Sequence, residues 1–456
     1  MGDITANLFS EFKAVSNHEW KTKLEKDLKG KPISSLHFNP EFDLKSKANF
    51  HPEEFVNQTY SNGSQLNNDN NDWAISESYI DLNSTETNKA ILTSLNEGIS
   101  GLKITISDST DFETLFNNVL IEHLFVHIVC TSKDNFTDLV AYLKTNHTKV
   151  SIIEMPFLSN GLINGTLSLD QLFIDDFIEQ SAEYCTKNLI IDGLSYCQFG
   201  ASSAQELGIA LSQLNEYIQR LSNQKVDDQF WQEKVGLHLG VTDNYFVNIA
   251  KFRAAKELVL QLQSQWEIDS NIMPWVSAET VNRHITVNDR QNNVLRQTTA
   301  AMSAVLGGVC QLIVRPYHEV TKNDEILSGR MAKNIQLILK DEVYFNQVID
   351  PSAGAYAIES YTDQLIEKAW EYFLIIESKG GYYKALSDNT IHQMINDSKI
   401  SQTQLLNSGT KTLLGINKFQ NGAESWQSTS PATENKGDFN GFSPFNLEQN
   451  FEKQMV

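Results

Sequence analysis

Histidine side chains four residues apart can bind a metal ion together when both lie on one face of a helix. His123 and His127 have this spacing. The segment that holds them, residues 122–129, is rich in β-branched and aromatic residues and is typical of a strand. In a strand, residues i and i+4 lie about 13 Å apart. We therefore predict no metal site at this pair.

No other short motif predicts an activity. The sequence contains no G-x-x-x-x-G-K-[ST] phosphate loop, no G-x-S-x-G nucleophile turn and no H-E-x-x-H zinc motif. The Asp and Glu residues are numerous and scattered, and spacing distinguishes no pair of them. Motifs that carry chemistry therefore assign no reaction to this chain.

The elements that would position a site alternate along the chain from Trp73 onward. Amphipathic helical patterns, such as those from Asp243 to Leu258 and from Asp289 to Leu306, separate short β-branched runs. The predicted strands are 102–106, 124–130, 150–154, 189–192, 235–241, 272–277, 311–314 and 347–349. Eight strands interleaved with helices favour an α/β fold of the (β/α)8 barrel type over a doubly wound sheet. No G-x-G-x-x-G follows an early strand, which also disfavours a dinucleotide-binding sheet.

One predicted strand, Val235–Val241, alternates apolar residues with Gly236, His238 and Gly240. Most barrels pack branched side chains inside. Two interpretations are open. In the first, the small and polar set faces the barrel centre and leaves room there, while Val and Leu face the helices. In the second, the strand lies near the rim of the barrel.

Segments on both sides of the barrel have a different character. Trp20, Leu24 and Leu28 follow an i, i+4, i+8 pattern that predicts one amphipathic helix, ended by Lys29-Gly30. Residues 57–72 are rich in Asn, Ser and Gly and predict a solvated linker or a wrapping arm. The tail from residue 420 is expected to pack on the barrel or on a partner, or to be partly disordered. We divide the chain into an arm (1–72), a barrel (73–400) and an extension (401–456).

The bulk composition excludes some partners. A formal net charge of −21 and a pI near 4.9 argue against nucleic acid and anionic membranes. The N-terminus shows no secretory signal, and no apolar run reaches the length of a membrane span. The four cysteines lie far apart, and we read those in apolar strand-like runs as buried free thiols. A cytoplasmic location fits these features.

Seven runs of sequence resemble the methylmalonyl-CoA mutase family. Trp73 to Ile104 aligns without gaps with the family's W-T-I-R-Q-Y-A-G-F-S segment and the helix and strand after it. The other runs, in chain order, are Gly200-Ala201 with Glu206, Ala250-Lys251 with Arg253-Ala254-Ala255, Asp289 to Met302 on the pattern D-x-x-N-N-V-x-R-x-x-x-x-A-M, Asn334 with Gln336, Asp350-Pro351 with Gly354 and Tyr356, and Gly415-Ile416-Asn417-Lys418. Each run is weak alone, but all occur in the right order. The resemblance implies a (β/α)8 barrel and the interconversion of methylmalonyl-CoA and succinyl-CoA.

The sequence departs from the family at positions that the family uses for substrate and cofactor. An Arg that pairs with acidic groups and a Tyr that wedges against the cofactor become Ser76 and Ser78. A Tyr-His pair, whose His hydrogen-bonds the thioester carbonyl, becomes Leu194 and Ser195. The strand-six Arg that would hold the substrate carboxylate falls at Trp275, and a strand-seven His falls at Ile313. Neither Trp nor Ile can replace a charged donor in a dry site. The resemblance therefore implies a degenerate site without catalytic residues.

The resemblance also bears on cofactor and partner. Family enzymes that carry a cobalamin domain hold the cobalt through the His of D-x-H-x-x-G, and none of the ten His residues here has Asp two positions before it. We expect a short form of the small subunit, which binds no cofactor or metal itself. Its partner would be a large catalytic subunit that holds adenosylcobalamin. The N-terminal helix and arm are similar to the small subunit's extension, which implies subunit contacts. The alternative is that the helix packs on its own barrel.

Two other functions are open at this point. The chain could be a catalytic barrel subunit of an acyl-CoA mutase that uses cobalamin carried on a separate protein, although Ser78 and Ser195 count against it. It could also be a free-standing acyl-CoA-binding or scaffold protein. The sequence does not decide whether acyl-CoA enters this barrel.

Overall fold

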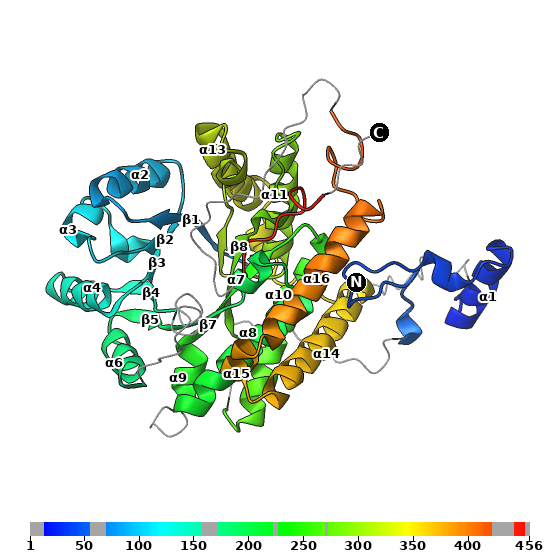
Figure 1. Ribbon diagram of the computed structural model, residues 1–456, viewed down its shortest axis with the longest axis horizontal. Coiled ribbons are helices and arrows are strands. Elements are labelled where there is room, and N and C mark those ends of the chain that lie inside the picture. The colour runs from blue at the N-terminus through cyan, green and yellow to red at the C-terminus, as the bar shows by residue number, and fades with distance from the viewer. Residues whose placement is uncertain are drawn as a thin grey trace, which may run out of the picture.

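The strands of this chain form one parallel sheet that curls into a barrel (Figure 1). The computed structural model describes residues 13–54, 70–156, 171–221, 227–269, 272–421 and 442–451. The order of the strands in the sheet is β5-β4-β3-β2-β1-β9-β8-β7-β6. Their bounds are β1 Ala74–Ile80, β2 Gly101–Thr105, β3 Phe125–Val129, β4 Val150–Glu154, β5 Cys185–Lys187, β6 Leu189–Asp192, β7 Val235–Val241, β8 Trp275–Thr280 and β9 Gln311–Ile313.

The two ends of this sheet meet at a single residue. β5 pairs with β4 and β6 pairs with β7, and only Asn188 separates β5 from β6 in the chain. The covalent chain therefore joins the two edges, and β5 with β6 occupies one of eight strand positions around the ring. The predicted (β/α)8 barrel is confirmed.

Helices surround the barrel on the outside (Figure 1). The longest of them follow the second half of the strands, where α8, α10 and α14 pack against one another. The main helices are α2 Ser84–Asn96, α4 Lys133–Thr145, α6 Gln171–Ser181, α7 Leu194–Gln198, α8 Ser203–Leu221, α9 Asp228–Glu233, α10 Tyr245–Gln265, α11 Asn292–Leu306, α13 Glu325–Leu337, α14 Tyr356–Ser378, α15 Tyr382–Ser387 and α16 Thr390–Asn407. Shorter helical turns are α3 Phe112–Leu115, η4 Ile121–His123, η5 Asn282–His284, α12 His318–Thr321, η6 Ile338–Glu342 and η7 Phe345–Gln347. Among the described residues, no helix is both long and apolar enough to cross a membrane.

The strand predictions need correction at three places. β1 was not among the predicted strands, because Ser76, Glu77 and Ser78 interrupt its apolar pattern. Residues 347–349 do not form a strand. Tyr344 has a positive φ of 59°, η7 follows it, and Val348 is half-exposed. A left-handed residue before a helical turn breaks the extended backbone that a strand needs. The strand predicted at 272–277 begins only at Trp275.

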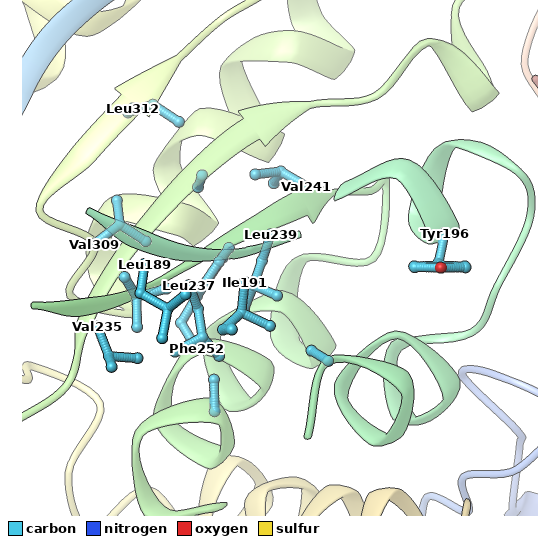
Figure 2. Packing of buried hydrophobic residues seen from close by; sticks show 14 of the residues in the cluster. Leu189, Ile191, Tyr196, Val235, Leu237, Leu239, Val241, Phe252, Val309 and Leu312 are labelled. Atoms are coloured by element: carbon cyan, nitrogen blue, oxygen red, sulfur yellow. The ribbon is translucent and has the colours of Figure 1, made fainter. Parts of the chain in front are cut away.

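The main apolar core lies between the barrel and its helices. Leu189, Ile191, Leu237 and Leu239 point from β6 and β7 toward the helices, where Phe252 of α10 meets them (Figure 2). All five side chains are buried. Alternate residues of β7 therefore serve the outer core and leave Gly236, His238 and Gly240 for the inside.

A buried ion pair supports β7 where β6 has already ended. Glu206 of α8 accepts a hydrogen bond from the Gly240 amide at 2.6 Å, and Lys251 of α10 donates to the Gly240 carbonyl. The Lys251 Nζ atom also lies 2.7 Å from a Glu206 carboxylate oxygen, and both side chains are fully buried. The two charged groups replace the strand partner that this edge of β7 lacks. Glu206 and Lys251 each belong to one of the seven runs that resemble the family, and this structural role accounts for that.

The N-terminal segment is anchored at one end and free at the other. Its helix α1 (Asn17–Asp27) begins at Ser16 in a capping box with Glu19. No residue of α1 is buried, and the helix lies well away from the barrel (Figure 1). The alternative that this helix packs on its own barrel is wrong. Residues 55–69, most of the Asn-rich segment predicted at 57–72, lie outside the described residues.

The part of the arm after α1 is fixed to the barrel helices through residues 40–44, which we call the root of the arm. Glu41 accepts hydrogen bonds from the Ser203 amide at 2.8 Å and the Ser203 hydroxyl at 2.9 Å, at the beginning of α8. Asp43 accepts from the Ser202 hydroxyl at 2.6 Å, and Leu44 is completely buried. A carboxylate at a helix N-terminus is stabilised by the free amides there. The root of the arm is therefore held by side-chain contacts, while no residue of α1 is buried against the described part of the barrel.

Near the other end of the chain, residues 442–451 pack on the carboxyl-terminal face of the barrel. Glu448 accepts from the amides of Val287 at 2.6 Å and Asn288 at 3.1 Å. The Phe442 ring stacks on His392 and Phe199. This part of the predicted extension therefore packs on its own barrel. Residues 422–441 and 452–456 lie outside the described residues.

Candidate functional site

The inside of the barrel holds charged side chains that meet across the ring. The Lys103 Nζ atom on β2 lies 2.8 Å from the His238 Nε2 atom on β7 and 3.2 Å from a Glu279 carboxylate oxygen on β8. In the sheet order, β1, β9 and β8 stand between β2 and β7. Contact between Lys103 and His238 is possible only through the interior. Of the two interpretations left open for this strand, the structure agrees with the first in placing His238 toward the barrel centre.

A second buried pair lies beside the first. The His127 Nε2 atom of β3 is 2.7 Å from a Glu154 carboxylate oxygen at the end of β4, and the rings of His127 and His238 are 6.3 Å apart. Arg315, just after β9, extends the cluster with its Nε atom 3.5 Å from the other Glu279 oxygen. We call Lys103, His127, Glu154, His238, Glu279 and Arg315 the lumen cluster. It joins strands from both halves of the barrel.

The pairing of opposite charges overcomes the cost of burying them. Burial raises the pKa of Glu279, but Lys103, His238 and Arg315 together hold that pKa well below its usual range. Burial likewise opposes ionisation of Glu154, and His127 and Lys103 reverse the effect and lower its pKa. Burial and the nearby Lys103 cation lower the pKa of His238 to about 4. At neutral pH the cluster therefore contains ionised carboxylates and a neutral His238 ring.

Hydrogen bonding assigns the tautomer of that neutral ring. The His238 Nε2 atom faces the Lys103 ammonium group, which can only donate. The proton of the ring therefore lies on Nδ1, which donates to the Ser277 hydroxyl at 2.6 Å. The Ser277 hydroxyl in turn donates to the Leu237 carbonyl at 3.3 Å. The cluster thus satisfies its own donors and acceptors along this line.

The two inward glycines of β7 do not leave an open channel. A Cβ atom at Gly236 would lie 2.6 Å from the Trp275 ring, and one at Gly240 would lie 2.6 Å from the Cys197 Cβ atom. Trp275 also stacks on Phe125 with ring centroids 5.9 Å apart. The interpretation that small inward residues leave room in the centre is therefore wrong at both positions, because other side chains occupy that room.

Of the six positions predicted as a degenerate site, two lie on β1. Ser76 is buried, and its hydroxyl accepts a hydrogen bond from the Gln311 amide at 3.1 Å. Ser78 is two residues nearer the carboxyl end of the strand and is exposed. Ile313 is buried on β9 and stands beside Ser76 in the register of the two strands. The structure therefore brings Ser76 and Ile313 together, with Ser78 at the mouth of the barrel.

The other three positions divide between the two ends of the barrel. Ser195 follows β6 and donates to an Asp192 carboxylate oxygen at 2.5 Å, while burial raises the pKa of Asp192 to about 6. Leu194 is buried against Cys197 and Val281. Trp275 begins β8, so it lies at the amino end of the strands. Trp275 is therefore separated from the other five positions along the barrel axis.

The lumen cluster itself was not predicted as a site. Its clearest sequence signal is Lys103, which stands between Leu102 and Ile104 in a predicted strand. Glu154 similarly ends an apolar run. A charge on a strand that is covered on both faces needs a partner, but no spacing in the sequence indicates which residue supplies it.

Neither histidine of the initial pair acts with the other. His123 belongs to η4 and is exposed, while His127 lies inside the barrel. Across the described ranges, no group of three or more His, Cys, Asp or Glu side chains is arranged to hold a metal ion. In chemical terms the lumen cluster is a set of mutually neutralised charges. Ser195 contacts the Asp192 carboxylate with no imidazole in that contact.

Comparison with known proteins identifies relatives for most of the chain. The family model described as methylmalonyl-CoA mutase matches residues 98–438. A methylmalonyl-CoA mutase small subunit of Porphyromonas gingivalis is 29% identical over 454 residues, which cover 91% of this chain and 72% of that protein. A small subunit of Streptomyces virginiae is 24% identical, covering 76% of this chain and 58% of the relative.

A longer relative matches over a smaller part. The methylmalonyl-CoA mutase of Rhizobium meliloti is 29% identical over 251 residues, or 54% of this chain and 35% of that enzyme. The matched region is therefore about a third of that enzyme's length and under two thirds of the Streptomyces protein.

Proposed function

Because this chain belongs to the methylmalonyl-CoA mutase family, we propose that it is the small subunit of a cobalamin-dependent methylmalonyl-CoA mutase. In this proposal the chain performs no chemistry itself and supports a large subunit that does. The degenerate positions Ser76, Ser78, Leu194, Ser195, Trp275 and Ile313 carry no catalytic role. The names of the Porphyromonas and Streptomyces relatives support the subunit assignment.

The observation that carries the proposal is the filled interior of the barrel. Barrel enzymes bind their substrates at the carboxyl ends of the strands. Here Lys103 bonds both His238 and Glu279 across the interior below those ends. A substrate that entered would have to separate these charges, and separating buried ion pairs costs several kcal/mol. In this proposal, the charged residues of the interior stabilise the folded barrel and take no part in turning over a substrate.

Cofactor contact is a second point of support. Where the resemblance places a Tyr against the cofactor, this chain has Ser78, whose short side chain is exposed at the mouth. Ser78 therefore does not fit the role of that Tyr. At the position of the imidazole that would bind the thioester carbonyl of the substrate, Ser195 is bonded to Asp192. In the proposal, adenosylcobalamin is held by the large subunit alone.

The arm supports the partner assignment. Trp20 and Leu24 lie on one side of α1, and they and the C-cap residue Leu28 are only half-buried. The helix projects from the barrel (Figure 1). An apolar stripe of this kind gains free energy when another surface covers it. We assign that surface to the large subunit.

Reconstitution tests the proposal. The chain is produced together with a mutase chain that carries both R-Q-Y and D-x-H-x-x-G, and the two are purified through a tag on one of them. We expect a stable complex with mutase activity, and no turnover by this chain alone with adenosylcobalamin. Turnover by the isolated chain would contradict its silence, and failure to co-purify would contradict the partner.

A further inference from the structure

A pocket outside the barrel lumen lies where the arm crosses the carboxyl-terminal face. Its empty volume is about 440 Å³, counting the part open to solvent. The walls come from the root of the arm, the residues after β7, η5, α16 and Lys411. The pocket thus brings together segments from the beginning, middle and end of the chain.

The pocket contains a buried guanidinium group without a counter-ion. Arg283 is 4% exposed and lines the pocket. Its NH2 atom donates to the carbonyls of Ala201 and Cys197, and its NH1 atom donates to the Gln402 amide oxygen at 3.4 Å. Its Nε atom has no hydrogen-bond partner among the described residues. No described carboxylate lies within ion-pair distance of Arg283, although buried charges are normally paired.

The other charged groups at the pocket form no ion pair with Arg283 among the described residues, and each of them has other partners. Lys411 and Asp243 neutralise each other, with Nζ 3.0 Å from a carboxylate oxygen. Glu41 is held by the first residue of α8, Ser203. His284, next to Arg283, is buried with neither ring nitrogen bonded in the described structure, and burial lowers its pKa to about 4, so it is neutral. The two cations and the two carboxylates of the lining sum to no net charge, so what distinguishes Arg283 is a buried guanidinium group with an unbonded Nε atom and no ion pair among the described residues.

The neutral groups around this charge include several hydrogen-bond donors. Ser398 and Ser401 of α16 line the same space with hydroxyl groups, whereas the Thr242 hydroxyl after β7 already donates to Asn248. A guanidinium group with hydroxyls and an ammonium group nearby matches the oxygens of a carboxylate or a phosphate. We propose that this pocket binds a small oxyanion, a carboxylate or phosphate group of a metabolite, with Arg283 as its main counter-ion.

Such a ligand would also touch the root of the arm. Pro40, Glu41 and Phe42 form one wall, opposite Gln402 and Leu405 of α16. A ligand that contacts both walls stabilises the conformation in which they face each other. The pocket shares no residue with the lumen cluster. Failure of oxyanion binding would therefore not contradict the proposed function.

Calorimetric titration with inorganic phosphate and, separately, with succinate tests the inference at constant ionic strength. Arg283→Ala is unsuitable alone, because it also removes bonds to Ala201 and Cys197. Ser401→Met instead fills the pocket, and Lys411→Ala removes a cation and frees Asp243. Arg290→Ala, which removes an arginine paired with Asp324 outside the pocket, is the matched control.

We expect one site per chain for at least one probe, with affinity reduced about tenfold or more by Ser401→Met and unchanged by Arg290→Ala. The probe that binds distinguishes phosphate from carboxylate. Binding that Ser401→Met and Lys411→Ala leave unchanged would show an adventitious ion only and overturn the inference. So would the absence of binding by both probes up to about 10 mM.

Discussion

The barrel lumen and helix α1 use their side chains in opposite ways. In the lumen, Lys103 bonds both His238 and Glu279, so little hydrogen-bonding capacity is left there for a ligand. On α1, Trp20 and Leu24 have no neighbouring surface that buries them. The part of the molecule where a barrel enzyme does its chemistry is closed, and the part outside the barrel is open to contact. This difference favours a protein that acts by binding another chain.

The largest expected effect concerns the closed region. Lys103→Met leaves Glu279 buried without its main cation, so we expect the free energy of unfolding to fall by about 3–5 kcal/mol. Urea denaturation measures the change. Lys23→Met is the control, because Lys23 pairs with Asp27 on the exposed surface of α1 and should contribute less than about 0.5 kcal/mol. A loss below about 1 kcal/mol for Lys103→Met would mean that the lumen cluster is not what holds the barrel closed.

The next effect concerns the open region. Leu24→Ala should weaken assembly with the large subunit by roughly 1.5–3 kcal/mol, because it removes an apolar side chain that the partner covers. The unfolding free energy of the isolated chain should change less than the assembly free energy, since Leu24 is only half-buried there. Sedimentation or titration calorimetry measures the assembly, with Lys26→Ala on the same helix as control. Equal affinities for Leu24→Ala and wild type would remove α1 from the interface.

A pH titration sharpens the description of the lumen. The pKa of His238 is lowered from 6.5 to about 4 by burial and by Lys103. Between these values the unfolded chain takes up a proton that the folded chain does not, so stability falls as the pH falls. His238 alone should account for about 2 kcal/mol between pH 7 and pH 5. The comparison is with His238→Gln, which should lose correspondingly less stability over that interval. If the unfolding free energies of the two proteins changed in parallel with pH, the lowered pKa of His238 would be contradicted.

The smallest expected effect tests most directly whether this chain takes part in catalysis. Ser195→Ala in the assembled complex should change kcat by less than about twofold, because no reacting group depends on this hydroxyl. The measurement is a steady-state assay with assembly verified in the same sample. A tenfold loss with assembly intact would favour the alternative in which this barrel does chemistry with cobalamin from another protein.

The fold could be predicted further than the site. The alternation of apolar runs and amphipathic helices identifies the barrel, and the pattern of Gly236, His238 and Gly240 identifies the inward face of β7. β1 was not predicted, because its inward residues, Ser76 and Ser78, are polar and interrupt the apolar pattern of a strand. Residues 347–349 were wrongly predicted as a strand. Their apolar character reflects neither a strand nor burial.

The lumen cluster could not be predicted, because its members find partners through the ring and not along the chain. Lys103 and Glu279 are 176 residues apart. Nothing local distinguishes Glu279 from the many other acidic residues. Only the closed ring makes Lys103 its partner. The same is true of the pocket at Arg283, whose walls include Glu41 and Gln402.

The break at Asn188 has a consequence for how the chain reaches its native state. Each edge of the sheet ends there, so strands β1 to β5 and strands β6 to β9 can each pair with sequence neighbours as they form. The remaining pairing, β1 with β9, joins Ser76 to Gln311 across 235 residues. Closing so long a loop is entropically costly and slow. We therefore expect two half-barrels to fold first and the seam between β1 and β9 to form last, in the rate-limiting step.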